Sequence, residues 1–337
     1  MKYLVTGHTG FKGSWLTAIL KLQGHEVHGI ALNPEEKSLF NQANISKYLT
    51  SDIRLDIREG ENLKKAFEKI NPEVVIHLAA QPLVRASYAD PIGTFETNVL
   101  GTLNVLEATK NLENLQATQI ITTDKVYKNK NQSKGYVETD ELGGDDPYSS
   151  SKAAADLATQ SWRFSFGTSP ISIVRAGNVI GGGDWSTDRI VPDIVKAIES
   201  QGSLTIRNPA AIRPWQHVLD CLSGYLTLIE MQLKERVEGE WNFGPTKGQI
   251  KNVLELTNSF SEAWGEKLEI NIQNSELKES NILLLDSQKS QSILKWNDQL
   301  DWNQTIQLTS IWYRSASNKK DCSQITESQI LDYLNIN

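Results

Sequence analysis

The first 32 residues contain the feature that most restricts how this chain can fold. The apolar run Lys2 to Thr6 predicts a buried strand, the amphipathic run Ser14 to Gln23 predicts a helix, and Glu26 to Leu32 predicts a second strand. The turn between the first strand and the helix reads Gly7-His8-Thr9-Gly10-Phe11-Lys12-Gly13. This succession is typical of a βαβ unit whose glycines let the backbone approach a pyrophosphate at the helix N-terminus. Because the spacing is G-x-x-G-x-x-G rather than G-x-G-x-x-G, a plain tight turn is the alternative interpretation.

Later segments continue the alternation of strands and helices. Strands are predicted at Glu73 to Ala80, Gln119 to Lys125 and Pro170 to Val174, and helices from Pro91 to Lys110 and from Tyr148 onward. The apolar residues of the helix that begins at Pro91 fall on one face: Phe95, Val99, Leu103 and Leu106. The predicted fold class is therefore α/β, a Rossmann-type doubly wound parallel sheet. After Val174 the alternation loosens, and the glycine-rich run from Arg175 to Trp185 predicts a loop.

The residue at the end of the second strand bears on the choice of dinucleotide. An acidic residue usually binds the adenosine ribose there, and this chain has Asn33 instead. No arginine is adjacent in sequence to hold a 2′-phosphate, so NAD is favoured over NADP. Asp56 either lies near the adenine or caps a helix. The residues predicted to bind the cofactor are Gly7, Thr9, Gly10, Phe11, Lys12, Gly13, Asn33, Asp56, Ile57, Leu78, Ala79, Ala80, Asn98, Tyr148 and Lys152.

Tyr148 and Lys152 are spaced to share one face of a helix. A tyrosine that acts as a base near neutral pH needs its pKa lowered by roughly 3 units from about 10. One cation at about 4 Å supplies roughly that, at an effective dielectric constant of about 20. The pair can therefore accept a proton from a hydroxyl group, although an ordinary helix start has the same spacing.

The strand from Gln119 to Lys125 ends in ionisable residues, Thr123, Asp124 and Lys125. In open parallel sheets the carboxyl ends of the strands form the ligand crevice. We therefore expect these side chains to point toward the same place as Tyr148, with ordinary strand-end capping as the alternative.

The charge composition excludes some partners and suggests others. A formal net charge of −7 and a pI near 5.4 argue against nucleic acid or an anionic membrane as a partner. Two cysteines are too few for a disulfide framework, metal-ligand spacings are missing, and no stretch resembles a signal peptide or a membrane span, so we expect a cytoplasmic protein without a metal. Arg189, Arg207 and Arg213 gather beyond the dinucleotide half, which indicates a phosphate-bearing substrate unless they are scattered surface residues.

With these features in hand, the chain resembles the extended short-chain dehydrogenase/reductase family. Four of its segments are similar to the CDP-glucose 4,6-dehydratases within that family. These segments are Gly7 to Leu16, Ala79 to Arg85, Arg175 to Trp185 and Ile212 to Val218, and the likeness runs from residue 1 to about 313.

The resemblance implies an organisation and a set of partners. It implies an NAD-binding Rossmann domain at 1–174 with a returning segment near 214–243, a nucleotide-sugar domain at 175–213 and 244–314, and a C-terminal tail at 315–337. In the tail, Thr326 and Gln329 are spaced as a capping box for a short helix. The resemblance also implies tightly held NAD and a homodimer or higher oligomer. In that oligomer, the helices from Pro91 to Lys110 and from Tyr148 to Phe164 form a four-helix bundle with their counterparts in the second subunit.

The resemblance further implies an activity and its residues. The activity is conversion of CDP-glucose to CDP-4-keto-6-deoxyglucose and water, a step of deoxysugar biosynthesis for lipopolysaccharide O-antigen. The implied catalytic residues are Thr123, Asp124, Lys125, Tyr148 and Lys152. The implied substrate-binding residues are Gln81, Arg85, Asn178, Arg189, Arg213 and Asn242.

This chain also departs from its relatives. Asp124-Lys125 stands where dTDP-glucose enzymes have Asp-Glu, which favours CDP-glucose, and Thr123 stands where serine is more frequent in CDP-glucose enzymes. Lys125 either removes the C5 proton of the sugar or positions Asp124. The alternative functions are a 4,6-dehydratase or 4-epimerase acting on another nucleotide sugar, and a catalytically silent NAD-sensing protein.

Overall fold

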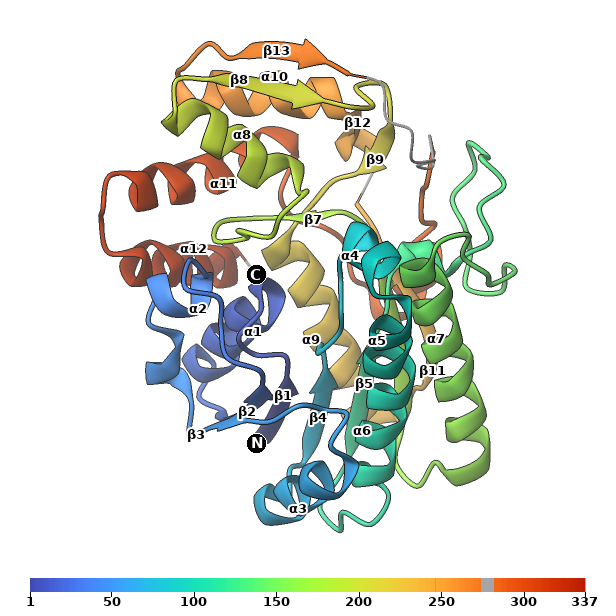
Figure 1. Ribbon diagram of the computed structural model, residues 1–337. Coiled ribbons are helices and arrows are strands. Elements are labelled where there is room, and N and C mark those ends of the chain that lie inside the picture. The colour runs from blue at the N-terminus through green and yellow to red at the C-terminus, as the bar shows by residue number, and fades with distance from the viewer. Residues whose placement is uncertain (246, 274–281, 337) are drawn as a thin grey trace.

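A seven-stranded parallel sheet forms the centre of the molecule (Figure 1). The computed structural model describes residues 1–245, 247–273 and 282–336. The sheet comprises β1 (Lys2–Thr6), β2 (Glu26–Ala31), β3 (Ser51–Arg54), β4 (Val74–His77), β5 (Ala117–Ile121), β6 (Ile171–Ala176) and β11 (Gly239–Phe243). Their order is β11-β6-β5-β4-β1-β2-β3, and every adjacent pair is parallel. The predicted Rossmann-type fold is confirmed.

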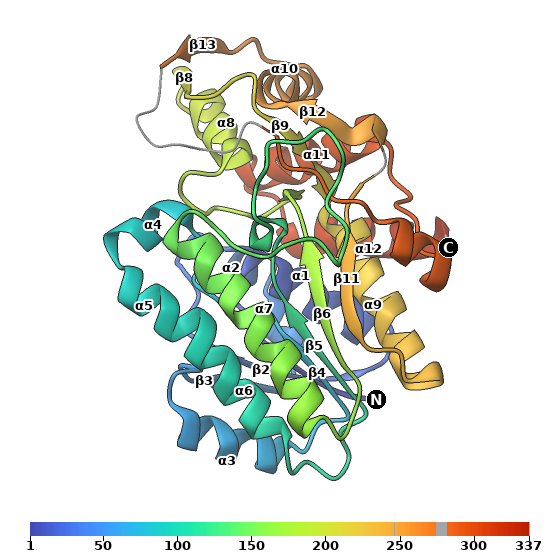
Figure 2. The ribbon, with the colours of Figure 1, turned by 90° about the vertical axis from the view of Figure 1, so that its right-hand side faces the viewer.

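Helices cover both faces of the sheet, which explains why its strands read as continuous apolar runs (Figure 2). One face packs against α1 (Phe11–Leu22) and α9 (Val218–Glu235), and α12 (Cys322–Ile336) lies outside them, against α1 and α11 (Trp302–Ser317). The other face packs against α3 (Gly60–Ile70), α6 (Gly101–Thr109) and α7 (Pro147–Phe166). Two buried clusters form the core on the two faces, one containing Trp15 of α1 and the other containing Phe67 of α3.

The predicted helix from Pro91 to Lys110 contains an irregular turn, and its predicted apolar face is only partly buried. It comprises α5 (Pro91–Phe95), the π-helical turn η2 (Glu96–Leu100) and α6. The side chains turned inward include Thr94, Asn98 and Thr102, and each of them is hydrogen-bonded. Of the predicted apolar face, Phe95 is exposed, Val99 and Leu103 are half-buried, and Leu106 is buried in the core. Hydrogen bonds of the inward polar residues and the burial of Leu106 therefore both hold this helix against the protein.

A second, smaller part lies above the carboxyl ends of the strands (Figure 1). It is built from β7 (Val179–Ile180), α8 (Ile190–Glu199), β8 (Ser203–Ile206), β9 (Ile212–Pro214), β10 (Gln216–His217), β12 (Ile250–Asn252), α10 (Val253–Trp264), β13 (Glu269–Ile272) and α11 (Trp302–Ser317). The run from Arg175 to Trp185 is not all loop, because β6 extends to Ala176 and β7 pairs with β10. The short helical segments are α2 (Leu39–Gln42), η1 (Ile45–Tyr48), α4 (Val84–Ala89), η3 (Asp124–Val126), η4 (Lys247–Gln249) and η5 (Ser290–Leu294).

The C-terminal segment is a packed helix. The predicted capping box at Thr326 and Gln329 is wrong, because both residues lie inside α12, which begins at Cys322. Thr326 Oγ1 accepts a hydrogen bond from Trp312 Nε1 at 2.9 Å, and Gln329 Nε2 donates to Leu308 O at 2.9 Å. Their side chains therefore join α12 to α11. Over the described ranges, no helix has both the length and the apolar content that a membrane crossing requires.

Candidate active site

A pocket of about 380 Å³ lies between the carboxyl ends of the strands and the smaller part of the molecule. This size is within the usual range of small-molecule sites. Its lining includes residues from the glycine turn, α4, the end of β5, the start of α7 and the smaller part: Phe11, Lys12, Arg85, Thr123, Asp124, Lys125, Tyr148, Asn178, Arg189, Arg207 and Arg213. The structure therefore brings four predicted catalytic residues to one pocket.

The turn after β5 presents a buried acid beside a lysine. Thr123 caps η3, and its hydroxyl donates to Asp124 Oδ1 at 2.9 Å. Asp124 is 2% exposed, and its Oδ2 has no hydrogen-bond partner among the described residues. Burial raises the pKa of Asp124, against the opposing charges of Lys125 and Arg213. Burial also lowers the pKa of Lys125, against the influence of Asp124. Burial thus shifts the titration of both groups toward their neutral forms.

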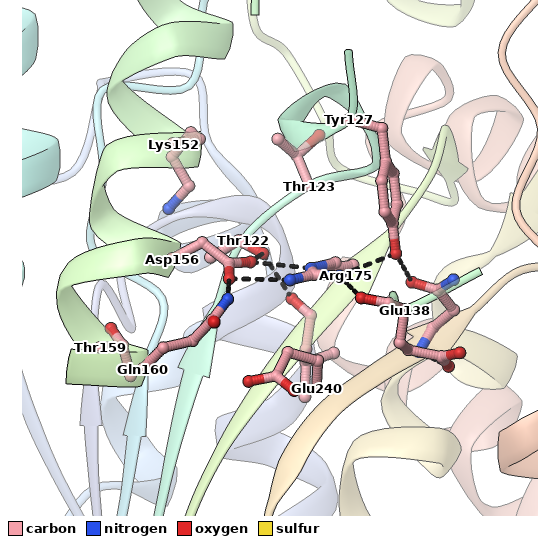
Figure 3. Close-up of polar contacts among 12 residues, drawn as sticks. Thr122, Thr123, Tyr127, Glu138, Lys152, Asp156, Thr159, Gln160, Arg175 and Glu240 are labelled. Atoms are coloured by element: carbon pink, nitrogen blue, oxygen red, sulfur yellow. Dashed lines mark hydrogen bonds and ion pairs between the residues drawn. The ribbon is translucent and has the colours of Figure 1, made fainter. Parts of the chain in front are cut away.

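Tyr148 and Lys152 share a face of α7, but their polar ends have different partners. Asp146 caps this helix by accepting a hydrogen bond from Ser149 N at 2.9 Å. Tyr148 lines the pocket, whereas Lys152 is 3% exposed and its Nζ donates to Ile121 O at 2.9 Å (Figure 3).

The expected lowering of the Tyr148 pKa by Lys152 is wrong for this structure, in which the pKa of Tyr148 is raised. Burial raises the pKa of Tyr148, and the largest opposing influences are Arg189 and a hydrogen bond with Thr123. Burial and the charge of Lys12 lower the pKa of Lys152 to about 8. The physical reason is that the Lys152 ammonium turns toward the end of β5, while the charge of Arg189, from the smaller part, acts on the phenol.

Four arginines surround the outer pocket. Arg85 Nη1 lies 3.2 Å from Asp188 Oδ1, and Arg207 Nη2 lies 3.0 Å from the same oxygen. Arg189 precedes α8, and Arg213 is 9% exposed in β9 beside the Asp124 turn. This concentration of guanidinium groups suits a phosphate-bearing ligand. Asp188 was not predicted as a site residue. Its position next to Arg189 in the sequence does not indicate that its carboxylate bridges Arg85 and Arg207, which are distant in sequence.

The glycine turn at the start of α1 has the geometry that a dinucleotide requires. Gly7 has φ +77°, and a Cβ atom there would lie 2.6 Å from Ala79 N. A Cβ atom on Gly13 would lie 2.2 Å from Gly7 O. Lys12 Nζ donates to Tyr225 OH at 3.1 Å and also borders the pocket. The turn can therefore bring backbone N–H groups and a cation close to a pyrophosphate.

The adenine end of the predicted cofactor site is more crowded than the sequence suggests. Asn33 is exposed, and Thr9 Oγ1 donates to Leu32 O at 3.2 Å. No arginine is adjacent to Asn33 in sequence, but the fold brings one close, because Arg54 Nη1 donates to Leu32 O at 3.3 Å. The Arg54 guanidinium is also engaged by Asp52 at 2.7 Å.

Several predicted cofactor residues serve the protein's own structure. The Asp56 carboxylate holds Arg58 at 2.7 Å, and the side chain of Ile57 is buried in the core. Leu78, Ala79 and Ala80 follow β4 and are half-buried, with Leu78 N donating to Thr6 O at 3.0 Å.

Three predicted contact residues have amides that bond to protein. Asn98 exchanges hydrogen bonds with the backbone of Gln81, at 2.8 and 3.1 Å, and Gln81 Nε2 donates to Thr94 Oγ1 at 2.8 Å. Asn242 is fully buried, accepts from Tyr127 OH at 2.8 Å and donates to Tyr136 O at 2.8 Å. Neither Gln81 nor Asn242 lines the pocket. Both side chains are therefore engaged by the protein's own structure.

The described residues contain no group of His, Cys, Asp and Glu side chains that could hold a metal ion.

Comparison with known proteins identifies relatives of the whole chain. Residues 4–309 match the family described as GDP-mannose 4,6 dehydratase. A CDP-glucose 4,6-dehydratase from Salmonella typhimurium is 39% identical over 99% of this chain and 96% of its own length. A dTDP-glucose 4,6-dehydratase from Escherichia coli is 25% identical over 95% of each chain.

Solved structures share the fold. A UDP-glucose 4-epimerase from Thermus thermophilus in complex with NAD is 25% identical and superposes with a TM-score of 0.82, covering 94% of this chain and 100% of that one. A dTDP-glucose 4,6-dehydratase from Streptomyces venezuelae with NAD and TYD bound is 23% identical, with a TM-score of 0.83 and coverage of 95% and 99%. The resemblance inferred from the four sequence motifs is confirmed, and its extent is greater than expected because it includes the C-terminal segment. The chain belongs to the GDP-mannose 4,6 dehydratase family of nucleotide-sugar enzymes.

Proposed function

We propose that this protein is an NAD-dependent CDP-glucose 4,6-dehydratase, which converts CDP-glucose to CDP-4-keto-6-deoxyglucose and water for deoxysugar biosynthesis. The observation that carries the proposal is one pocket in which Thr123, Asp124, Lys125 and Tyr148 meet four arginines beside the glycine turn. The 39% identity to a CDP-glucose 4,6-dehydratase along nearly the whole chain supports the choice of substrate.

Binding of the nucleotide sugar uses the arginines at the pocket mouth. The diphosphate replaces the Asp188 carboxylate between Arg85 and Arg207, and Arg189 and Arg213 extend the same positive region toward Asp124. Asn178 borders this region and contributes a side-chain amide. Gln81 and Asn242 hold the surrounding structure.

Oxidation at C4 of the sugar begins at Tyr148. The phenolate removes the proton of the 4-hydroxyl, and Thr123 hydrogen-bonds the same oxygen and orients it. When bound at the glycine turn, NAD supplies a hydride acceptor at C4 and later a hydride donor at C6. Gly7, Gly13 and Lys12 would hold the pyrophosphate, and Lys152 would hold the nicotinamide ribose. Burial raises the pKa of Tyr148, and the charge of Arg189 opposes that rise.

Loss of water uses the residues after Thr123. The 4-ketone makes the C5 hydrogen acidic, Lys125 removes it, and Asp124 protonates the departing 6-hydroxyl. The pKa directions support these roles, because burial keeps Asp124 protonated more readily and makes Lys125 a better base. The C5 proton then returns from the same side chain.

The experiment that tests the function is an assay of pure protein, supplied with NAD, on CDP-, dTDP-, UDP- and GDP-glucose. We expect a 4-keto-6-deoxy product from CDP-glucose at the highest rate. A hexose inverted at C4 would indicate a 4-epimerase instead. No product from any nucleotide sugar would contradict the proposed activity and leave the NAD-sensing alternative.

The same proposal includes a homodimer in the cytoplasm. Exposed apolar residues line the outer faces of the α5–η2–α6 helix and α7, which lie side by side: Ile92, Phe95, Leu100, Leu157 and Phe164. A surface of this kind is typical of a protein–protein contact, and the twofold-related copy supplies the matching helices. Both cysteines are buried and unpaired, which suits a reducing compartment.

A further inference from the structure

A fully buried arginine connects the two segments that carry the proposed catalytic groups. Arg175 of β6 is 0% exposed and forms a two-pronged ion pair with Asp156 of α7 (Figure 3). The Nε–Oδ2 and Nη2–Oδ1 distances are both 2.8 Å. Gln160 Nε2 also donates to Asp156 Oδ1 at 2.8 Å, so both oxygens of this buried carboxylate are satisfied. A buried ion pair generally adds little stability over an apolar pair of similar volume. Stability alone therefore does not account for the Arg175–Asp156 pair.

The remaining edge of the guanidinium reaches the turn after β5. Arg175 Nη1 donates to Tyr127 OH at 2.9 Å, and Tyr127 closes the turn that contains Thr123, Asp124 and Lys125. At the other end of that turn, Thr122 Oγ1 lies 3.4 Å from Asp156 Oδ2. The ion pair therefore holds both ends of the segment 122–127.

The same carboxylate belongs to the helix that carries the tyrosine and the lysine. Asp156 lies four residues after Lys152 and eight after Tyr148, so the three positions follow one face of α7. Lys152 Nζ donates to Ile121 O at 2.9 Å, directly before the turn. Arg175, Asp156 and Tyr127 themselves do not line the pocket.

We propose that Arg175, through its ion pair with Asp156 and its hydrogen bond to Tyr127, is a positioning residue that sets Lys152 against the Thr123–Lys125 turn. This inference rests on the proposed function. Arg175 acts through residues that border the pocket and has no contact of its own with the reacting atoms.

The charges around Lys152 give the proposal a measurable consequence. Lys12 of α1 and His77 of β4 face Lys152, as do Tyr148 and Asp156 on its own helix. Burial and the charge of Lys152 lower the pKa of His77 to about 3, so this imidazole is neutral. Asp156 is thus the negative charge that keeps Lys152 protonated against burial and Lys12. A buried carboxylate held by Arg175 preserves the ammonium up to about pH 8.

The first test is Asp156→Asn, which keeps the shape of the side chain and removes its charge. We expect the loss of activity at high pH to begin about 1 to 3 pH units lower than in the wild type, with kcat reduced more than tenfold at pH 8. NAD binding, followed by tryptophan fluorescence from pH 6 to 10 without substrate, should weaken at the same lower pH. The matched control is Arg163→Gln, which breaks the 2.7 Å ion pair with Glu240 that also joins α7 to β11. Its pH limits should stay at those of the wild type.

The second test is Tyr127→Phe, which removes one hydroxyl and leaves both charges. We expect kcat to fall about tenfold or more, since small misplacements of catalytic groups are costly, while KM and the alkaline pH limit stay unchanged. Identical pH limits in Asp156→Asn and Arg163→Gln, or wild-type kcat in Tyr127→Phe, would overturn the proposal. If Asp156→Asn does not fold, Tyr127→Phe decides alone. Failure of the wild type on all nucleotide sugars would contradict the proposed function instead, whereas the NAD titration tests the positioning without turnover.

Discussion

Tyr148 and Lys152 illustrate what residue spacing can predict. Their separation of four residues places them on one face of α7, as the structure shows. Spacing does not fix where a long, flexible side chain ends, and Lys152 turns to Ile121 O. Arg189, whose charge opposes the rise that burial causes in the pKa of Tyr148, comes from a segment more than 40 residues later and from the other part of the molecule. Sequence alone therefore identified the pair without identifying the cation that acts on the phenol.

Replacement of Tyr148 tests the proposed base. In Tyr148→Phe the ring remains and the proton acceptor is lost, so we expect turnover to fall by about 10²–10⁴-fold. Formation of the keto product measures this loss. NAD binding should be retained, because Lys152 and the glycine turn are unchanged, and it serves as the control for folding. Turnover within threefold of the wild type would rule out this role for the phenol.

Replacement of Lys125 tests the proposed C5 base. The sequence left its role open, because a neighbouring aspartate raises the pKa of a lysine. The structure adds burial, which is the larger effect and lowers the pKa of Lys125. In Lys125→Met, exchange of the C5 hydrogen with deuterated solvent should slow by about 10²-fold or more, while transient oxidation at C4 persists. Mass spectrometry of the recovered nucleotide sugar measures the exchange. Wild-type exchange in this variant would leave Lys125 only the role of positioning Asp124.

At the scale of elements, the regular pattern was predictable and the irregular pieces were not. The strands β1, β2, β4, β5 and β6 were found from their apolar runs, since a buried parallel strand has no polar face. The extension of β6 to Ala176 was missed, because Arg175 reads as the end of a strand when its buried partner Asp156 is unknown. The wrong capping box in α12 has a similar cause. Local spacing cannot reveal that the side chains of Thr326 and Gln329 bond to α11 instead of capping their own helix.

The docking of α12 gives a prediction about stability and pH. Tyr333 OH of α12 donates to Asp220 Oδ1 of α9 at 2.8 Å. Burial raises the pKa of Asp220 from 3.8 to about 6, and the Tyr333 hydrogen bond opposes that rise. The folded protein therefore holds a proton that the unfolded chain releases, so its free energy of unfolding falls as pH rises from about 4 to 6. The shift corresponds to about 3 kcal/mol.

Tyr333→Phe should make this pH dependence steeper. Without its donor the Asp220 carboxylate is less favoured in the folded state, and we expect a further loss of about 1–2 kcal/mol at pH 7. At pH 4, where Asp220 is protonated in the folded protein, the difference from the wild type should be smaller. Urea unfolding at both pH values measures it. Ser328→Ala, on the exposed face of the same helix, is the control and should match the wild type. An equal loss at pH 4 and pH 7 would contradict the linkage to Asp220.

At the scale of the whole molecule, the pocket depends on both parts of the chain. Thr123 and Tyr148 come from the sheet half, whereas Arg189, Arg207 and Arg213 come from the smaller part. The sequence predicted an arginine cluster from its local density but could not show that it faces the end of β5. The position of the arginine cluster opposite the end of β5 depends on β11, which returns the chain to the sheet beside β6 after the smaller part has begun.

The outward apolar face of the long helices predicts the oligomeric state. Phe164 is 94% exposed, Ile92 is 70% exposed, and Leu100 and Leu157 are each 54% exposed, values that are costly for an isolated subunit. A second copy that places its own helices on this face buries them in a four-helix bundle, with the same patch used on both subunits. We therefore expect the wild type to be a dimer at micromolar concentration.

Leu100→Glu combined with Leu157→Glu places two carboxylates in the centre of the contact and should give monomers with an unchanged circular dichroism spectrum. Sedimentation velocity measures the state, and Leu331→Glu, an exposed apolar position on α12, is the matched control that should remain dimeric. A dimer that survives the double substitution would place the contact on a different face.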